Sequence, residues 1–73
     1  MTAIKAGGFY WIHDGDETVL VESIDANGVA ELRGTSLHNW NEETSMHVSA
    51  IGPAVGAELA ALKIELLRRT NKR

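Results

Sequence analysis

The sequence predicts an α+β fold, in which one C-terminal α-helix packs on an antiparallel β-meander of three to four strands. Apolar, aromatic and β-branched residues alternate in three successive segments, as is typical of strands. These segments are residues 8–13, 17–24 and 29–33. An Asp-Gly and an Asn-Gly dipeptide separate them, and both favour tight hairpin turns because Gly accepts a positive φ. Strong helix formers then dominate residues 54–69.

The length indicates a single small domain over residues 1–73, with the meander in 8–51, a loop in 34–45 and the helix in 53–69. Below roughly 80 residues a single core rarely contributes more than about 3–5 kcal/mol, so small domains often need a further source of stability. The chain has no cysteine, which excludes disulfides and thiolate metal sites. Self-association is then the simplest remaining source.

The first predicted strand is the most aromatic part of the chain. Alternation places Phe9, Trp11 and His13 on one side of it, and Tyr10 and Ile12 on the other. Because both sides are apolar or aromatic, we expect this strand to be covered on both faces and to lie in the centre of the core.

The next two strands have clearer inner and outer sides. In the second, Leu20 and Ile24 share one side, with Glu22 between them. In the third, Glu31 and Arg33 point outward with Val29. Val19 and Val21 share the other side of the second strand, and alternation directs Ala30 and Leu32 of the third to the core.

Residues 34–45 are rich in Asn and Ser and show no clear period. We expect a loop with a helical turn near 39–43, in which Leu37 and Trp40 fold back onto the sheet. Residues 46–51 alternate, and they predict a fourth strand at the edge of the sheet.

The C-terminal helix is predicted to begin at Pro53, because the first helical position tolerates the missing N–H of proline. At about 100° per residue the helix carries two apolar faces. The face expected on the sheet comprises Val55, Leu59, Leu62 and Leu66. The second face comprises Ala60, Ile64 and Leu67. We expect this second face to be a homo-oligomer interface, most simply in a twofold dimer; the alternative is a monomer in which Trp40 covers Ile64.

Charge divides the chain into an acidic and a basic part. Residues 1–45 carry two basic and eight acidic side chains, whereas residues 46–73 carry five basic and two acidic ones. An acidic surface repels nucleic-acid phosphates and suits a basic protein surface. We therefore expect a partner protein with a basic surface and no direct nucleic-acid binding; the alternative is a merely solvated surface. The predicted acidic rim comprises Asp14, Asp16, Glu17, Glu22, Glu42 and Glu43.

No pattern of catalytic, cofactor or metal-binding residues stands out. The acidic turn after His13 lacks the ladder of oxygen ligands of a calcium loop. Nothing indicates that the three histidines converge on a metal, no serine lies in a nucleophile motif, and no Gly-rich phosphate loop is present. We expect a protein that is not an enzyme and has no cofactor. A ligand that stacks on aromatic rings would use Tyr10, Trp11 and Trp40.

Composition and hydropathy indicate a cytoplasmic location. Hydrophobic residues make up 44% and charged residues 23% of the chain, as in ordinary globular domains. No export signal is recognisable at the N-terminus, and no apolar run approaches the length of a membrane span. For a virus-borne protein, the cytoplasm would be that of the host cell.

Three short motifs resemble small uncharacterised phage and prophage proteins. They are Gly8-Phe9-Tyr10-Trp11-Ile12, then Val19-Leu20-Val21-Glu22, and later Ile51-Gly52-Pro53. The resemblance covers residues 7–53 and does not include the helix. Several small phage proteins inhibit host defence, including anti-CRISPR proteins and sponges for signalling nucleotides. The resemblance implies such a role and assigns no functional residue.

The sequence is therefore compatible with three functions. The first is a non-catalytic, phage-type inhibitor that occludes a basic surface of a host protein. The second is an oligomeric sponge for a small signalling nucleotide, with Arg33 or Lys63 on its phosphate. The third is a structural or assembly subunit that binds no ligand.

Overall fold

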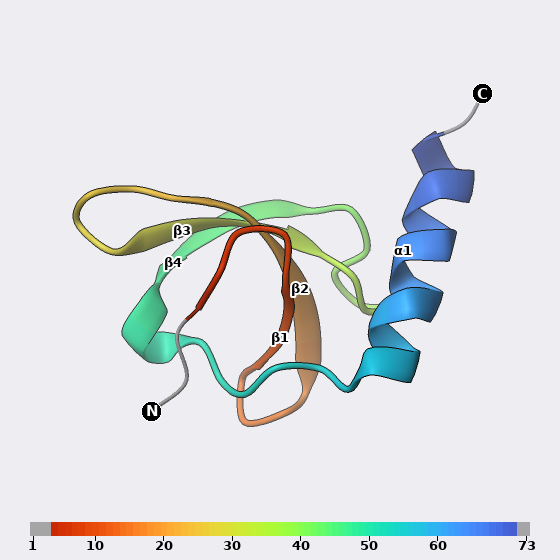
Figure 1. The fold of residues 1–73 in the computed structure, drawn as a ribbon, viewed down its shortest axis with the longest axis horizontal. Helices are drawn as coiled ribbons and strands as arrows, with labels where there is room; N and C mark the ends of the chain where they lie inside the picture. Colours follow the sequence, from red (N-terminus) through yellow and green to blue (C-terminus); the bar gives the residue numbers. More distant parts are fainter. Residues whose placement is uncertain (1–3, 72–73) are drawn as a thin grey trace.

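The computed structural model describes residues 4–71, which form a four-stranded antiparallel sheet and one C-terminal helix (Figure 1). The strand order along the sheet is β1-β2-β3-β4, so consecutive strands are neighbours. This confirms the α+β meander that the sequence predicts. The elements are β1 (Phe9–Ile12), β2 (Glu17–Ile24), β3 (Val29–Gly34), β4 (Glu43–His47), the short 3₁₀ helix η1 (Val48–Ala50) and α1 (Ala57–Asn71).

A β-bulge in β2 changes which side chains share a face. The pairing of β2 with β3 shifts register between Val21 and Ser23. One extra residue in a strand reverses the alternation beyond it. Ile24 therefore packs with the same apolar cluster as Val21, rather than on the side of Leu20. The strict alternation expected along 17–24 was wrong at this point.

An extended segment, residues 51–55, returns to cover the free edge of β1. Gly52 N donates to Trp11 O at 2.7 Å, Trp11 N donates to Pro53 O at 3.0 Å, and Val55 N donates to Phe9 O at 2.9 Å. Pro53 therefore lies in a strand-like segment, and α1 begins only at Ala57. The prediction that Pro53 opens the helix was wrong, because its carbonyl is used to pair with β1.

The fourth strand lies earlier in the chain than the alternation of 46–51 predicts. Gly34 N donates to Glu42 O at 2.8 Å and Asn41 N to Gly34 O at 2.9 Å, so the chain reverses within residues 35–42 and pairing begins at Glu43. A Cβ on Gly34 would overlap the backbone of Asn39, so this tight reversal requires glycine. After His47 the chain leaves the sheet through η1.

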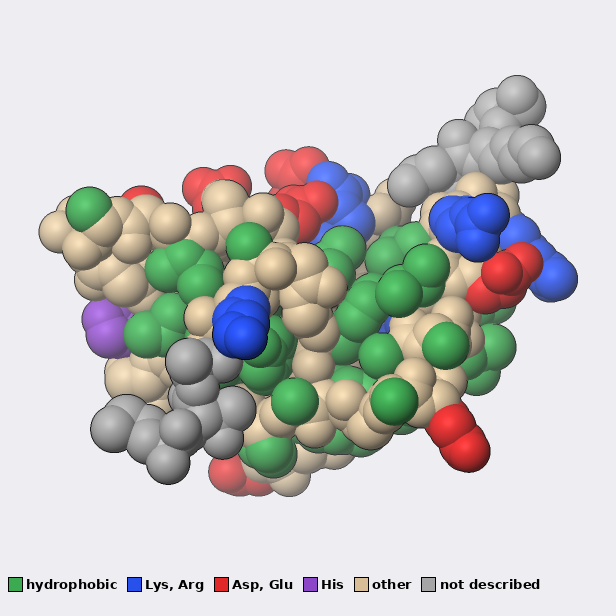
Figure 2. All heavy atoms as spheres, in the orientation of Figure 1, with side chains coloured by type: hydrophobic (Ala, Val, Ile, Leu, Met, Phe, Trp, Pro, Cys, Tyr) green, Lys and Arg blue, Asp and Glu red, His purple; other side chains and the backbone are tan. Residues whose placement is uncertain are grey.

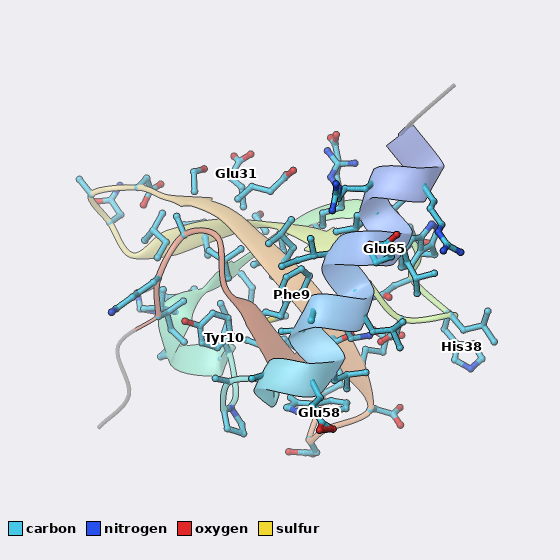
Figure 3. All side chains as sticks on the ribbon, turned by 45° about the vertical axis from the view of Figure 1, so that its right-hand side comes forward. Phe9, Tyr10, Glu31, His38, Glu58 and Glu65 are labelled. Carbon is cyan, nitrogen blue, oxygen red and sulfur yellow. The ribbon has the colours of Figure 1, made fainter. Side chains whose placement is uncertain are left out.

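The sheet has an apolar cluster on each face, and β1 contributes to both. The inner cluster gathers Tyr10, Ile12, Val19, Val21, Ala30, Leu32 and Ile51. The outer cluster, between the sheet and α1, gathers Phe9, Val55 and Leu67, with Trp11, Leu20, Trp40, Leu59 and Ala60 packed against it. Figure 3 shows Phe9 beside α1 and Tyr10 away from it. The expectation that β1 is covered on both faces is confirmed.

The helix turns a different face to the sheet from the one predicted. Leu67 is 8% exposed and Lys63 is 9% exposed, whereas Leu62 and Leu66 are 53% and 40% exposed. Val55 and Leu59 of the predicted stripe do pack in the outer cluster. Val55 belongs to the extended segment rather than to α1, however, so the helix phase counted from it was wrong for Leu62 and Leu66.

The predicted oligomer interface does not form one exposed face. Ala60 packs against the outer cluster and Leu67 is buried in it, while Ile64 is 47% exposed. Ala60 and Leu67 therefore contribute to the packing of α1 on the sheet, and Ile64 is the member of this set that is exposed.

The connection between β3 and β4 differs from its prediction in one residue. Trp40 packs on the outer cluster as expected, but Leu37 is 91% exposed and does not fold back. The turn near residues 39–43 is closed by Glu42 N, which donates to Asn39 O at 3.0 Å.

Candidate functional site

The β1–β2 hairpin presents acidic side chains on an unusual backbone. His13, Asp14 and Gly15 have φ values of 53°, 59° and 87°. Gly15 N and Asp16 N both donate to Ile12 O at 3.1 Å, which closes the turn. Asp and His are among the few side chains that tolerate the left-handed region. The hairpin therefore holds His13, Asp14 and Asp16 exposed at its tip.

A groove lies between this hairpin and the segment from η1 to Pro53. Its volume is about 530 Å³, and its lining includes Trp11, His13, Asp14, Ala50 and Pro53. A Cβ on Gly52 would lie 2.8 Å from Trp11 O, so glycine permits the close pairing that forms one wall. The groove combines a half-buried indole, a proline and a carboxylate at one end. We call it the Trp11 groove.

The predicted acidic rim is divided among three places. Asp14 and Asp16 lie at the hairpin tip. Glu17 and Glu42 line a shallow pocket of about 220 Å³ beside the hairpin. His13 also lines that pocket, with its Nε2 3.8 Å from Glu17 Oε1.

The remaining two carboxylates of the rim are engaged by one arginine. Arg33 Nε donates to Glu22 Oε2 at 2.9 Å, and Arg33 NH2 donates to Glu43 Oε2 at 3.2 Å. The hydrogen bond that Arg33 donates to Glu22 and the charges of both carboxylates raise the pKa of Arg33. NH1 also donates to Asn41 Oδ1 at 3.0 Å. Glu22 and Glu43 are therefore partly neutralised.

The three aromatic residues proposed for ligand stacking do not form one site. Tyr10 is buried in the inner cluster, and its hydroxyl accepts from Lys5 N at 3.0 Å. Trp11 lines the groove beside the hairpin, whereas Trp40 lines a separate pocket against α1. The prediction of a shared stacking site was wrong, because successive residues of a strand face opposite sides.

Lys63 is the residue of functional interest whose environment the sequence did not reveal. Its Nζ donates to the buried carbonyl of Thr35 at 2.8 Å, and burial lowers its pKa. Leu59, Lys63 and Leu67 are spaced four residues apart, so they share one helix face. The sequence could have indicated this environment, because it places a lysine between two leucines on one face of the helix.

The described residues provide no indication of a metal centre or a membrane span. Within residues 4–71, no three His, Asp or Glu side chains gather closely enough to hold a metal ion. Over the same range, α1 is too short and too polar to cross a bilayer. Lys72 and Arg73, which belong to the basic end of the sequence, lie outside the described residues.

Comparisons of the chain with protein-family models, with curated proteins and with solved structures find no match.

Proposed function

We propose that this chain is a non-catalytic protein-binding module, which holds a basic segment of a partner in the Trp11 groove and beside the hairpin carboxylates. The supporting observation is that the groove places an indole, a proline and Asp14 along one surface. A Lys or Arg side chain can contact an indole face through a cation–π interaction while its charge is matched by nearby carboxylates. An apolar stem of the same side chain would lie on Pro53.

The proposed biological role is that of a phage-type inhibitor in the host cytoplasm. An acidic protein that occupies a basic site on a host protein blocks whatever that site normally binds. The carboxylates of Asp14 and Asp16 support this role, because neither forms an ion pair among the described residues. Both carboxylates are exposed to a partner. The resemblance of residues 7–53 to small phage proteins points to the same role.

Charge removal at the hairpin tests the proposal. The tagged protein is used to capture partners from host lysate, as wild type and as the double variant Asp14→Asn with Asp16→Asn. The matched control, Glu31→Gln with Glu65→Gln, also removes two negative charges, at positions that lie apart from each other in Figure 3. The hairpin variant should fail to capture a specific partner, and so should the wild type at high salt. The control variant should still capture it.

Obstruction of the groove gives an independent test. Ala50 is exposed and lines the groove, so Ala50→Arg should fill it and repel a basic segment without disturbing the core. Ala61→Arg, at an exposed position of α1, is the control. If Ala50→Arg binds the captured partner as tightly as Ala61→Arg does, the groove is not the binding site.

A further inference from the structure

A second pocket lies on the other side of the outer cluster, between the segment after β3 and α1. Its volume is about 560 Å³, within the range of small-molecule sites. Figure 2 shows apolar side chains gathered between α1 and the sheet. The lining residues are Thr35, Ser36, Leu37, Trp40, Lys63 and Leu66. We call it the Lys63 pocket.

The pocket contains a buried cation with spare hydrogen-bonding capacity. Lys63 is 9% exposed, and its Nζ donates to Thr35 O at 2.8 Å. An ammonium group has three donors, so one backbone carbonyl leaves two of them available. Among residues 4–71, the structure shows no carboxylate paired with Lys63. Burial of an ammonium group without a counter-charge is unfavourable. A bound anion would supply that counter-charge.

The other polar groups of the pocket are already committed to the fold. Ser36 Oγ accepts from Thr18 N at 2.7 Å and lies 3.0 Å from Thr18 Oγ1. Thr35 Oγ1 lies 2.8 Å from Thr18 Oγ1, and Asn39 Oδ1 accepts from Ser36 N at 2.9 Å. This network fixes residues 35–39 on β2. Lys63 is therefore the lining group that can meet a ligand's charge, and the side walls, Leu37, Trp40 and Leu66, are largely apolar.

We propose that the Lys63 pocket binds an apolar monocarboxylate, with its carboxylate on Lys63 Nζ and its apolar body against Trp40 and Leu66. The single cation matches one negative charge. A nucleotide phosphate would need more donors, and Arg33 is held by Glu22 and Glu43. This site is separate from the Trp11 groove and does not depend on the function proposed for it.

The lowered pKa of Lys63 predicts how binding responds to pH. A carboxylate beside the ammonium favours its charged form, so the bound state holds the proton more tightly than the free state. Affinity should therefore be constant over the pH range in which the ligand carboxylate is ionised and Lys63 is protonated, and should fall once the pH exceeds the lowered pKa of Lys63.

The first experiment compares a carboxylate with its neutral isostere. Isothermal titration with 3-phenylpropionate should give saturable binding with one site per chain, and 3-phenylpropanamide should bind about tenfold more weakly, since only the acid offers a charged acceptor. Lys63→Met should abolish the preference, whereas Lys5→Met, at an exposed position, should retain it. Absence of saturable binding, or equal affinity for acid and amide, overturns the proposal.

Leu37 provides variants that leave the core intact, because its side chain is 91% exposed at the pocket rim. A positive charge there should tighten 3-phenylpropionate binding and a negative charge should weaken it, each by about two- to fivefold, as expected of an exposed charge near an ion pair. Equal affinities for Leu37→Lys and Leu37→Glu would count against the site.

Two sources could supply the carboxylate, a free small acid or the C-terminus of a peptide. A short peptide that ends in Leu-Phe is compared with the same peptide amidated at its C-terminus. Tighter binding of the free-acid peptide than of 3-phenylpropionate assigns the site to chain ends. Binding of 3-phenylpropionate alone assigns it to a small acid.

Discussion

At the level of single residues, the hairpin tip shows how side-chain type and backbone conformation are matched. His13 and Asp14 are two consecutive non-glycine residues with positive φ. Such a conformation costs roughly 1–2 kcal/mol per residue for most side chains, but less for Asp and His. The Asp-Gly dipeptide predicted a turn here. The left-handed conformation of His13 follows from the pairing of Ile12 with Glu17, which leaves four residues to reverse the chain.

Substitution of His13 tests this backbone constraint. Its side chain is 60% exposed, so little burial is lost on mutation. His13→Val should lower the free energy of unfolding by about 1–2 kcal/mol, because a β-branched side chain clashes in the left-handed region. His13→Asn, which tolerates that region, should change it by less than about 0.5 kcal/mol. Urea denaturation measures both, and equal values would refute the constraint.

Lys63 should give the protein a distinctive dependence of stability on pH. Burial lowers its pKa in the folded state below the ordinary value of 10.5. Between these two values the unfolded chain binds more protons than the folded one, so stability rises with pH. The gain is absent below the lowered pKa and complete above 10.5.

The comparison of wild type with Lys63→Met isolates this effect. The free energy of unfolding of the wild type, minus that of the variant, should increase as the pH rises from the lowered pKa of Lys63 to 10.5. Urea denaturation at a series of pH values, without added ligand, measures it. A difference that stays constant or declines would show that Lys63 is not desolvated by folding.

At the level of elements, the position of α1 depends on where it begins. The helix formers after Gly56 were recognisable in the sequence, and the helix exists where they lie. Its phase was not recognisable, because four leucines and an isoleucine give two plausible apolar faces. The pairing of residues 51–55 with β1 removes Val55 from the helix and directs Leu67 and Lys63 toward the sheet.

Truncation of two leucines distinguishes the observed phase from the predicted one. Leu67→Ala should destabilise the protein by about 2–4 kcal/mol, because it removes a buried side chain from the outer cluster. Leu62→Ala, which alters a side chain that is 53% exposed, should cost less than about 1 kcal/mol. Thermal or urea unfolding measures the loss of stability in both variants. A larger loss for Leu62→Ala than for Leu67→Ala would support the predicted stripe of Val55, Leu59, Leu62 and Leu66.

At the level of the whole molecule, the two apolar clusters explain how so short a chain forms a core without disulfides. The sheet is covered on both faces, by Ile51 with Ile4 and Val48 on one side and by α1 on the other. The apolar residues that suggested self-association are largely used within one chain.

Ile64 provides the remaining test of the predicted interface. It is the exposed member of the set Ala60, Ile64 and Leu67, so Ile64→Glu can be made without disturbing the outer cluster. We expect the sedimentation coefficient at high micromolar concentration to be the same for wild type and Ile64→Glu. A smaller coefficient for the variant would show that this part of α1 mediates association.

The sequence by itself determined the elements that depend on neighbouring residues. Alternation predicted β1, β2 and β3, the Asp-Gly and Asn-Gly dipeptides predicted the turns between them, and helix formers predicted α1. These signals are local, since strand alternation, positive φ and helix propensity act within a few residues. The acidic composition of the hairpin tip was visible for the same reason.

The tertiary structure decided every feature that depends on distant pairing. The bulge in β2, the return of residues 51–55 to β1 and the burial of Lys63 against Thr35 each require contacts between segments far apart in the chain. A local pattern cannot show which of two apolar faces a distant segment will cover. Both candidate sites arise at such contacts, which is why the sequence indicated some of their residues but did not place them together.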